Sequence, residues 1–453
     1  MILVTAVILL VALATGPLAR NAAAVRPPLA SNIPGQPAWL RPAPPFGFRV
    51  WAGAAAISIT LTVLAIAFAP AFEVAAAFFG LVVLGVITAI FRRYASGCAE
   101  SRAAVAAFAP RIAMPYAGKV GIHIGMWSPW VERTGIPWVI VAQSPALFHQ
   151  LAAMYPQTPI VQGDIPASVT GALYSHGATA NTAFIERAPD ATHVFLGHGD
   201  SDKPLSASER VLQYDLVAVA GPAAIDRFVA AGLDVPAHKI RVIGRPQTEG
   251  IRVGAKRVPG HPTILYAPTW RHADDALNVS SLAVADRIVQ ALLDRGCTVM
   301  FRRHFAGQNH VEAEAMIARV NEMLLDDYER TNRPHWFGTE AMERPLIDAF
   351  NDADAMVSDV SGIVVDFMAS LKPLVMYAAQ FDDPDAFRTA HPTAQAAYVI
   401  DRHLTQLDSV LDAALGKDPL AAKRAERADH YLGGPDRTDP ARRFVELVAE
   451  LGG

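Results

Sequence analysis

Residues 355–369 read AMVSDVSGIVVDFMA, and this stretch organises the second half of the chain. An apolar approach ends at Ser358, and an apolar, helix-like run resumes at Ile363 after a short polar break. The pattern is typical of a buried strand that leads directly into a helix. We expect Ser361 to cap this helix and Gly362 to let a ligand approach its first backbone N–H groups, which favour an anion such as phosphate. Taken alone, the stretch also fits an ordinary capped helix.

From residue 112 onward, short β-branched runs alternate with helical stretches. The predicted strands of the first half are 119–124, 138–142, 193–196, 216–219 and 240–243, and those of the second half are 263–266, 298–301, 353–357 and 373–377. This alternation predicts an α/β fold with two Rossmann-like lobes, the GT-B-like architecture, preceded by N-terminal transmembrane helices. The predicted lobes are 112–245 and 246–403, followed by C-terminal helices at 404–453. Epimerases and dehydrogenases show the same alternation.

The N-terminal part is strongly apolar. Residues 1–18 carry no charge and are predicted as a transmembrane helix or signal anchor, although a cleaved signal peptide is an alternative. Residues 19–49 form a linker rich in proline, alanine and arginine. Residues 50–92 contain two apolar runs of ~20 residues, each long enough to cross a bilayer. Arginines before and after this hairpin predict a multi-pass protein of the cell membrane with a cytoplasmic catalytic domain. The alternative is a buried hairpin of a soluble protein.

Composition excludes some classes of function. The net charge of −4 gives no basic field that would suggest a nucleic-acid partner. Cys98 and Cys297 are the only cysteines, so the chain has neither a disulfide framework nor a cysteine-based zinc site, as is usual in a reducing compartment.

Polar residues follow three consecutive strands predicted in the second half. They are Thr269 and Arg271 after the first strand, Arg302 and His304 after the second, and Asp359, Ser361 and Gly362 after the third. Because ligands bind beyond the carboxyl ends of parallel strands, we expect these residues at one edge. Guanidinium groups and backbone N–H groups match a pyrophosphate bidentately, so the three loops together predict a site for a diphosphate donor.

The first half contains a further loop, LGHGDSDK, at residues 196–203. A histidine between two glycines lacks neighbouring side chains that would bury it, so His198 should titrate near neutrality and could act as a general base. Lys203 could bind phosphate. The alternatives are a turn histidine without a role and a solvated surface lysine.

Together these residues resemble the CDP-glycerol glycerophosphotransferase family, the enzymes of teichoic-acid-type polymers, over residues 193–379. The family's motifs are matched by His198-Gly199 with Lys203, by YAPTWR at residues 266–271, by Arg302 and His304, and by Ser358-Asp359 and Ser361 with Asp366 in the following helix. The chain departs from the family pattern at Val360, Gly362 and Phe305. It also departs at Gly244-Arg245-Pro246-Gln247, where the family has a final arginine.

The resemblance implies a transferase that moves glycerol phosphate, or a related polyol phosphate, from a CDP-activated donor to a hydroxyl of a lipid-linked or glycan acceptor and releases CMP. It implies that residues 112–245 bind the acceptor and residues 246–403 the CDP donor. His198 would be the base and His304 the second catalytic residue. The donor and its phosphates would be bound by Lys203, Thr269, Arg271, Arg302, Asp359, Ser361 and Gly362. No metal ligand and no certain cofactor is predicted, and a dependence on Mg²⁺ stays open.

Two other functions stay open at this point. The same loops would serve a GT-B glycosyltransferase or an epimerase that uses a UDP-sugar, and the identity of the released nucleotide separates the two. A non-catalytic membrane scaffold with a degenerate transferase lobe is the other alternative, and an absence of nucleotide binding would favour it.

Overall fold

The structure is a computed structural model and describes residues 30–35, 99–118, 121–197, 208–254, 261–272, 278–304, 311–435 and 437–453. The predicted spans at 1–18 and 50–92 lie outside these ranges. Among the described residues, no helix combines the length and the apolar character needed to cross a bilayer. The chain forms two compact units. Unit 1 contains residues 1–125, 135–193 and 451–453, and unit 2 contains residues 126–134 and 194–450.

The first sheet has the strand order β1-β4-β3-β2-β5-β6-β7-β8. Its strands are β1 (Ala30–Ser31), β2 (Ile112–Tyr116), β3 (Trp138–Ala142), β4 (Ile160–Gln162), β5 (Gly171–Tyr174), β6 (Thr192–Phe195), β7 (Leu216–Val219) and β8 (Ile240–Val242). Strand β1 pairs antiparallel with β4, whereas β2 to β5 and β6 to β8 pair in parallel. The associated helices are α4 (Ile122–Gly125), α5 (Ser128–Arg133), α6 (Pro145–Met154), α7 (Asn181–Arg187) and α8 (Pro222–Ala230), with short 3-10 turns η2 (Glu209–Gln213), η3 (Ala237–Lys239) and η4 (Pro246–Thr248).

The strand predicted at 119–124 is wrong. The structure has β2 earlier, at Ile112–Tyr116, and the helix α4 over Ile122–Gly125. All five residues of β2 are buried, so the strand is specified by burial and not by an alternating pattern. Pro115 is tolerated there because β5 pairs only with Ile112 and Ala113, and Pro115 lies beyond the end of that ladder.

The second sheet lies entirely in unit 2 and is parallel throughout. Its order is β10-β9-β11-β12-β13, with β9 (Thr263–Ala267), β10 (Thr298–Phe301), β11 (Ala355–Ser358), β12 (Leu374–Ala378) and β13 (Tyr398–Asp401). The helices that come after β9 in the chain are α9 (Ala285–Asp294), α10 (Val311–Thr331), α11 (Gly338–Glu343), α12 (Leu346–Asp352), α13 (Gly362–Met368), α14 (Pro384–Ala390), α15 (Leu407–Leu415), α16 (Ala421–Leu432) and α17 (Arg442–Gly452), with η6 (Ser281–Val284) and η7 (Pro392–Ala396).

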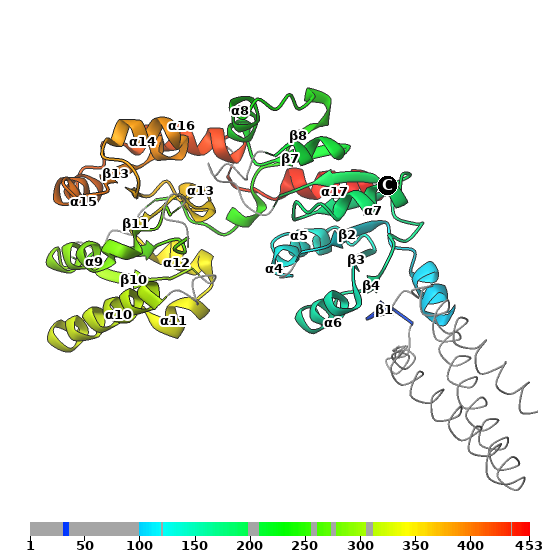
Figure 1. Cartoon of the computed structure of the whole chain (residues 1–453), viewed down its shortest axis with the longest axis horizontal. Coiled ribbons are helices and arrows are strands. Elements are labelled where there is room, and N and C mark those ends of the chain that lie inside the picture. The colour runs from blue at the N-terminus through cyan, green and yellow to red at the C-terminus, as the bar shows by residue number, and fades with distance from the viewer. Residues whose placement is uncertain are drawn as a thin grey trace, which may run out of the picture. The chain divides into compact units, whose positions relative to one another are not determined.

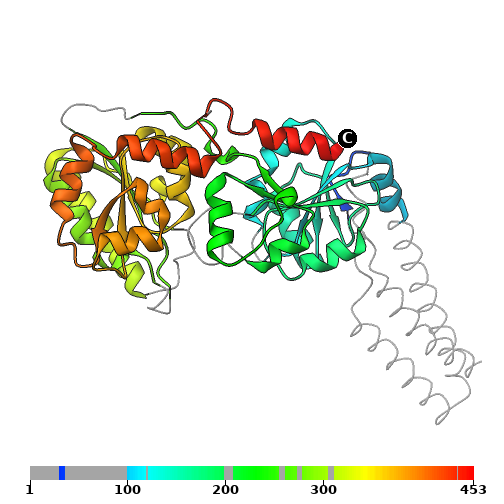
Figure 2. The same ribbon diagram turned by 90° about the horizontal axis from the view of Figure 1, so that it is seen from above.

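Alternate residues of these strands enter two different cores. In β9, Ile264 and Tyr266 pack with α9, α10 and α15, whereas Leu265 and Ala267 pack with α12 and α13. The helices of the two cores lie on opposite sides of the sheet (Figure 1), and the turned view shows the strands enclosed between helices (Figure 2). A parallel sheet covered on both faces explains why its strands appear in the sequence as continuous apolar runs. This architecture confirms the predicted α/β, Rossmann-like, GT-B-type fold class.

Candidate active site

The strand ends that the sequence predicts to converge belong to three neighbouring strands of unit 2. Strand β9 lies between β10 and β11, and both pairs are parallel. Phe301 at the end of β10 pairs with Tyr266, and Ser358 at the end of β11 pairs with Ala267. The three strands therefore end level with one another. The polar residues that follow them lie at the carboxyl edge of the sheet, where ligands of such folds bind.

Asp359 connects two of these loops. Its carboxylate is fully buried, and Oδ2 accepts hydrogen bonds from the backbone N–H groups of Thr269 at 2.7 Å and Ser281 at 3.1 Å. Burial and the nearby Asp359 carboxylate raise the pKa of Tyr266, whose hydroxyl lies 2.9 Å from Ser281 Oγ. The sequence predicts that Asp359 binds phosphate. In the structure its Oδ2 is already bonded to two backbone N–H groups, and it thereby holds the loop after β9 in place.

Thr269 brings a hydroxyl to the same edge. The residue is 3 % exposed, and its backbone carbonyl accepts a hydrogen bond of 2.7 Å from Ser280 Oγ. Among the described residues, its Oγ1 is buried and has no hydrogen-bond partner. Because buried hydroxyls are nearly always paired, an unpaired one at a sheet edge indicates a group that a ligand completes.

Arg302 and His304 directly follow β10 and are both partly buried. Arg302 Nη1 donates hydrogen bonds of 2.7 Å to the backbone carbonyls of Ala341 and Arg344. These bonds hold the guanidinium beside the end of α11, and burial lowers its pKa. Since carbonyl oxygens carry no net charge, the positive charge of Arg302 remains available to an anion at this edge.

Ser361 occupies the N-cap position of α13, as predicted, with extended backbone angles. The expected capping bond is absent, because the Ser361 side chain accepts no hydrogen bond from the first turn of the helix. The backbone N–H of Val364 instead bonds the Ser361 carbonyl at 3.2 Å. Both Ser361 and Gly362 are partly exposed, so the hydroxyl and the start of the helix can reach a ligand.

Arg271 is placed at the end of the loop after β9 and forms an ion pair with Glu312 in the first turn of α10. The arginine side chain is 21 % exposed, whereas the glutamate side chain is 72 % exposed. In this structure the Arg271 guanidinium is therefore held by a carboxylate from α10.

His198 and Lys203 lie outside the described residues. The chain is described up to Gly197, which has a left-handed φ of +67°. The indole N–H of Trp127 donates a hydrogen bond of 3.0 Å to the Gly197 carbonyl. This conformation requires a glycine just before His198, which explains part of the glycine-rich pattern.

The sequence reasoning missed the contact between Arg245 and Asp366. Arg245 Nε donates to Asp366 Oδ1 at 2.7 Å and Nη2 donates to Oδ2 at 3.3 Å, and both side chains are largely buried. The pair joins the segment after β8 to α13. The available signal was an aspartate within an otherwise apolar helix, because a buried charge needs a partner.

Metal ligands do not gather in the part of the chain that the structure describes. Among those residues no three histidine, cysteine, aspartate or glutamate side chains lie close enough together to hold a metal ion. The structure therefore assigns no residue to Mg²⁺.

Parallel strands bring hydroxyls, a guanidinium and the start of a helix to one edge of this α/β sheet, an arrangement suited to a phosphorylated ligand. Residues 244–390 match the family described as CDP-Glycerol:Poly(glycerophosphate) glycerophosphotransferase. This match confirms the resemblance over these residues, and the protein is an enzyme similar to the CDP-glycerol glycerophosphotransferases.

Solved structures with a similar fold include a wall teichoic acid polymerase, TagF, at 11% identity and a TM-score of 0.47, with 76% of this chain and 89% of that chain covered. MnaA of S. aureus with UDP has 12% identity and a TM-score of 0.48, with 75% and 96% covered. A glycosyltransferase of Rickettsia africae has 13% identity and a TM-score of 0.43, with 76% and 98% covered. Among curated proteins, none matches the sequence.

Proposed function

We propose that the protein transfers glycerol phosphate, or a related polyol phosphate, from a CDP-activated donor to a hydroxyl of a lipid-linked or glycan acceptor. CMP is released, and the product is a cell-wall polymer of the teichoic-acid type. The observation that carries this proposal is the alignment of β10, β9 and β11, which brings the polar loops of the family-matched region to one sheet edge.

In this proposal the diphosphate of the donor lies at the carboxyl edge of those three strands. The guanidinium of Arg302 and the imidazole of His304 neutralise negative charge on it, while the Ser361 hydroxyl and the start of α13 donate hydrogen bonds. Thr269 Oγ1, which is buried and unpaired among the described residues, supplies another hydroxyl. Positioned charges and donors of this kind are the largest contribution to phosphoryl transfer.

The reaction then forms one bond and breaks one bond. The acceptor hydroxyl oxygen attacks the β-phosphorus of the donor, the bridging P–O bond breaks, and CMP leaves with the electron pair. His198 takes the proton of the attacking hydroxyl as a general base. His304 stabilises the charge that develops on the diphosphate, and Lys203 binds a phosphate from the loop that follows Gly197.

The membrane attachment belongs to the same proposal. Two apolar runs between residues 50 and 92 would anchor the enzyme, and the arginines around them would keep the catalytic part on the cytoplasmic side. A lipid-linked acceptor would then be held at the surface on which the enzyme sits.

The test incubates membranes that carry the full chain with CDP-glycerol, other CDP-polyols and UDP-sugars, and identifies the released nucleotide. We expect CMP, together with an acceptor that gains the polyol phosphate. Release of UDP would assign the protein to the sugar transferases or epimerases. A lack of binding of both CMP and CDP-glycerol would indicate a non-catalytic scaffold. The matched control is the His304→Ala variant, which should retain the fold and lose turnover.

A further inference from the structure

A short segment of the predicted linker is docked on unit 1. Residues 30–35 fall within the predicted linker, and their first two residues form β1, which pairs antiparallel with β4. Figure 1 shows β1 beside β4, at one end of the strand order of the sheet. Ala30 and Ile33 are each 3 % exposed. The segment therefore adds a strand to the sheet and buries apolar side chains, as an extended peptide does when it binds to a strand edge.

Asn32 fixes the segment just beyond β1. Its φ of +59° is left-handed, a conformation that asparagine tolerates better than most residues. Its side-chain Nδ2 donates hydrogen bonds to two backbone carbonyls that follow α6, that of Thr158 at 3.0 Å and that of Tyr155 at 3.4 Å. One asparagine thus supplies both the turn after the strand and two donors for the connection between α6 and β4.

Tyr155 extends this contact to another part of unit 1. It is the C-cap residue of α6, and its hydroxyl donates to the Gly121 carbonyl at 2.8 Å and accepts from the Gly125 N–H at 2.9 Å. Residues 121–125, here called the α4 segment, approach α6 closely. A Cβ atom at Gly121 would lie 2.4 Å from Leu151 Cδ2, so glycine allows this approach without a shift of the buried leucine. The last turn of α6 therefore holds the α4 segment.

The α4 segment lies at the carboxyl edge of the first sheet. It follows β2, whose last residue, Tyr116, has its hydroxyl 2.9 Å from His123 Nδ1. The rings of His123 and His176 stack with 5.1 Å between their centroids, and His176 follows β5. This edge of a parallel sheet is where ligands bind. The docked linker segment and this edge are thus connected through Tyr155.

We propose that residues 30–35 form a strap that couples the N-terminal part of the chain to the α4 segment. While the strap is docked, Asn32 holds Tyr155, and Tyr155 holds the α4 segment. When the strap leaves β4, the α4 segment loosens, and with it the edge that carries His123. The docked state depends on a strand of two residues and two side-chain hydrogen bonds, so the strap opens without unfolding of unit 1.

The position of the strap in the sequence gives this coupling a role. The strap stands between residues 1–18 and 50–92, the apolar regions that are proposed to anchor the chain. Both regions are covalently continuous with it, so a change in the way they are held acts directly on the strap. Through Asn32 and Tyr155 this change would reach the edge of the sheet. The inference goes beyond the proposed function and does not depend on which reaction the protein catalyses.

The test measures backbone hydrogen exchange in the full-length protein and in two variants of Asn32. Asn32→Gly keeps the left-handed conformation but removes both donors, whereas Asn32→Asp is isosteric and places a carboxylate against the two carbonyls. We expect the amides of residues 30–35 to exchange about fivefold faster in Asn32→Gly, as for the loss of one hydrogen bond, and faster still in Asn32→Asp. Exchange in the α4 segment should accelerate in the same order.

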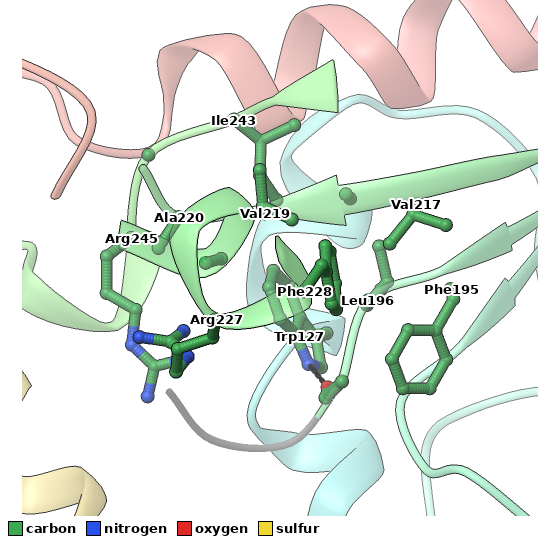
Figure 3. A pocket seen from close by; sticks show the side chains of 14 residues that line it. Trp127, Phe195, Leu196, Val217, Val219, Ala220, Arg227, Phe228, Ile243 and Arg245 are labelled. Atoms are coloured by element: carbon green, nitrogen blue, oxygen red, sulfur yellow. Dashed lines mark hydrogen bonds between the residues drawn. The ribbon is translucent and has the colours of Figure 1, made fainter. Parts of the chain in front are cut away.

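Two controls separate release of the strap from other effects. Asn21→Asp adds the same charge to the same predicted linker outside residues 30–35, and it should exchange like the wild type. The internal reference is β7 with α8 in unit 2, whose side chains Val219 and Phe228 line the cavity shown in Figure 3. Exchange in this reference should be equal in all proteins.

The variant Tyr155→Phe tests the route of the coupling, because it removes the hydroxyl and keeps the ring. It should loosen the α4 segment and leave residues 30–35 protected, and adding Asn32→Asp to it should not accelerate the α4 segment further. A full additional acceleration in the double variant would overturn the proposal. So would unprotected amides at 30–35 in the wild type, an α4 segment that responds to no change of Asn32, or equal acceleration of the reference in unit 2.

Discussion

At the scale of single residues, the candidate site combines side chains that are proposed to bind the donor with side chains that hold other residues in place. Arg302 donates to two neutral backbone carbonyls, which do not neutralise its charge, and Thr269 presents a buried hydroxyl. Asp359 differs from both, because its Oδ2 binds two backbone N–H groups and holds the loop after β9. A motif residue can therefore have a structural role at the candidate site.

Replacement of His198 by alanine should reduce turnover by at least ~10²-fold, because the attacking hydroxyl would lose its general base. The measurement is CMP release at saturating donor. The control is His238→Ala, at an exposed histidine of η3 outside the proposed site. Turnover of His198→Ala close to that of the control would remove His198 from this role.

At the scale of elements, α10 is anchored at its C-terminal end by a buried carboxylate. Asp327 accepts hydrogen bonds from Arg333 at 2.5 Å and 2.8 Å and from His335 at 2.9 Å. His335 Nδ1 accepts a hydrogen bond of 3.0 Å from the backbone N–H of Val299. Nε2 therefore carries the proton of the ring and donates the hydrogen bond to Asp327. This network joins α10 to β10 and thereby supports the strand that precedes Arg302.

The Asp327 network makes stability depend on pH. Burial alone would raise the pKa of Asp327, but hydrogen bonds from Arg333, His335 and Thr331 lower it from 3.8 to about 2. A carboxylate whose pKa is lower in the folded protein than in the unfolded chain stabilises the fold at pH values above its unfolded pKa. This contribution is lost as the pH falls from about 4 to about 2. It amounts to roughly 2 kcal/mol.

The free energy of unfolding of Asp327→Asn should therefore be lower than that of the wild type at pH 7. The difference between the two proteins should shrink as the pH falls from 4 to 2. Urea unfolding of both proteins across this range measures it. Asp383→Asn, which changes an exposed helix cap, is the control for a general effect of losing one carboxylate. If the difference in the free energy of unfolding stays constant down to pH 2, the pH-dependent stability does not come from Asp327.

At the scale of the whole molecule, a few long-range contacts connect segments that are distant in sequence. The buried pair of Arg245 and Asp366 spans 121 positions and ties the segment after β8 to α13. Within unit 2 the pair fixes the segment after β8 relative to α13. Gln247, at the position where the family has an arginine, donates a hydrogen bond of 2.5 Å to the Met126 carbonyl.

Breaking this pair on one side should be costly. Asp366→Ala leaves a buried guanidinium without its carboxylate, and we expect a loss of about 3–5 kcal/mol in the free energy of unfolding. The double variant Arg245→Leu/Asp366→Ala should recover most of that loss, since it removes both charges. A double-mutant cycle by denaturant unfolding measures the coupling, and additive effects of the two single changes would show that the pair is not coupled.

The proposed attachment to the membrane also concerns the whole chain. Deletion of residues 50–92 should move the protein from the membrane fraction to the soluble fraction, because the apolar runs in this segment are the proposed anchor. Fractionation followed by a test for extraction with sodium carbonate distinguishes an integral protein from one bound at the surface. Full-length protein that is extracted by carbonate would contradict the proposed spans.

The sequence by itself determined the fold class, three strands with unchanged bounds at residues 138–142, 216–219 and 298–301, and the loops that meet at the sheet edge. These features depend on local runs of apolar residues and on the rule that parallel strands end at one edge. It did not reveal β2, whose buried residues Ile112–Tyr116 lack a distinctive pattern, or the short strands β4 and β5.

Only the tertiary structure decided which polar groups are already partnered. The burial of Asp359, the pairing of Arg245 with Asp366 and the missing cap bond of Ser361 depend on residues far away in the sequence. The physical reason is that a charge or a hydroxyl is stabilised by whatever group packs against it. Packing brings together positions that no local pattern relates.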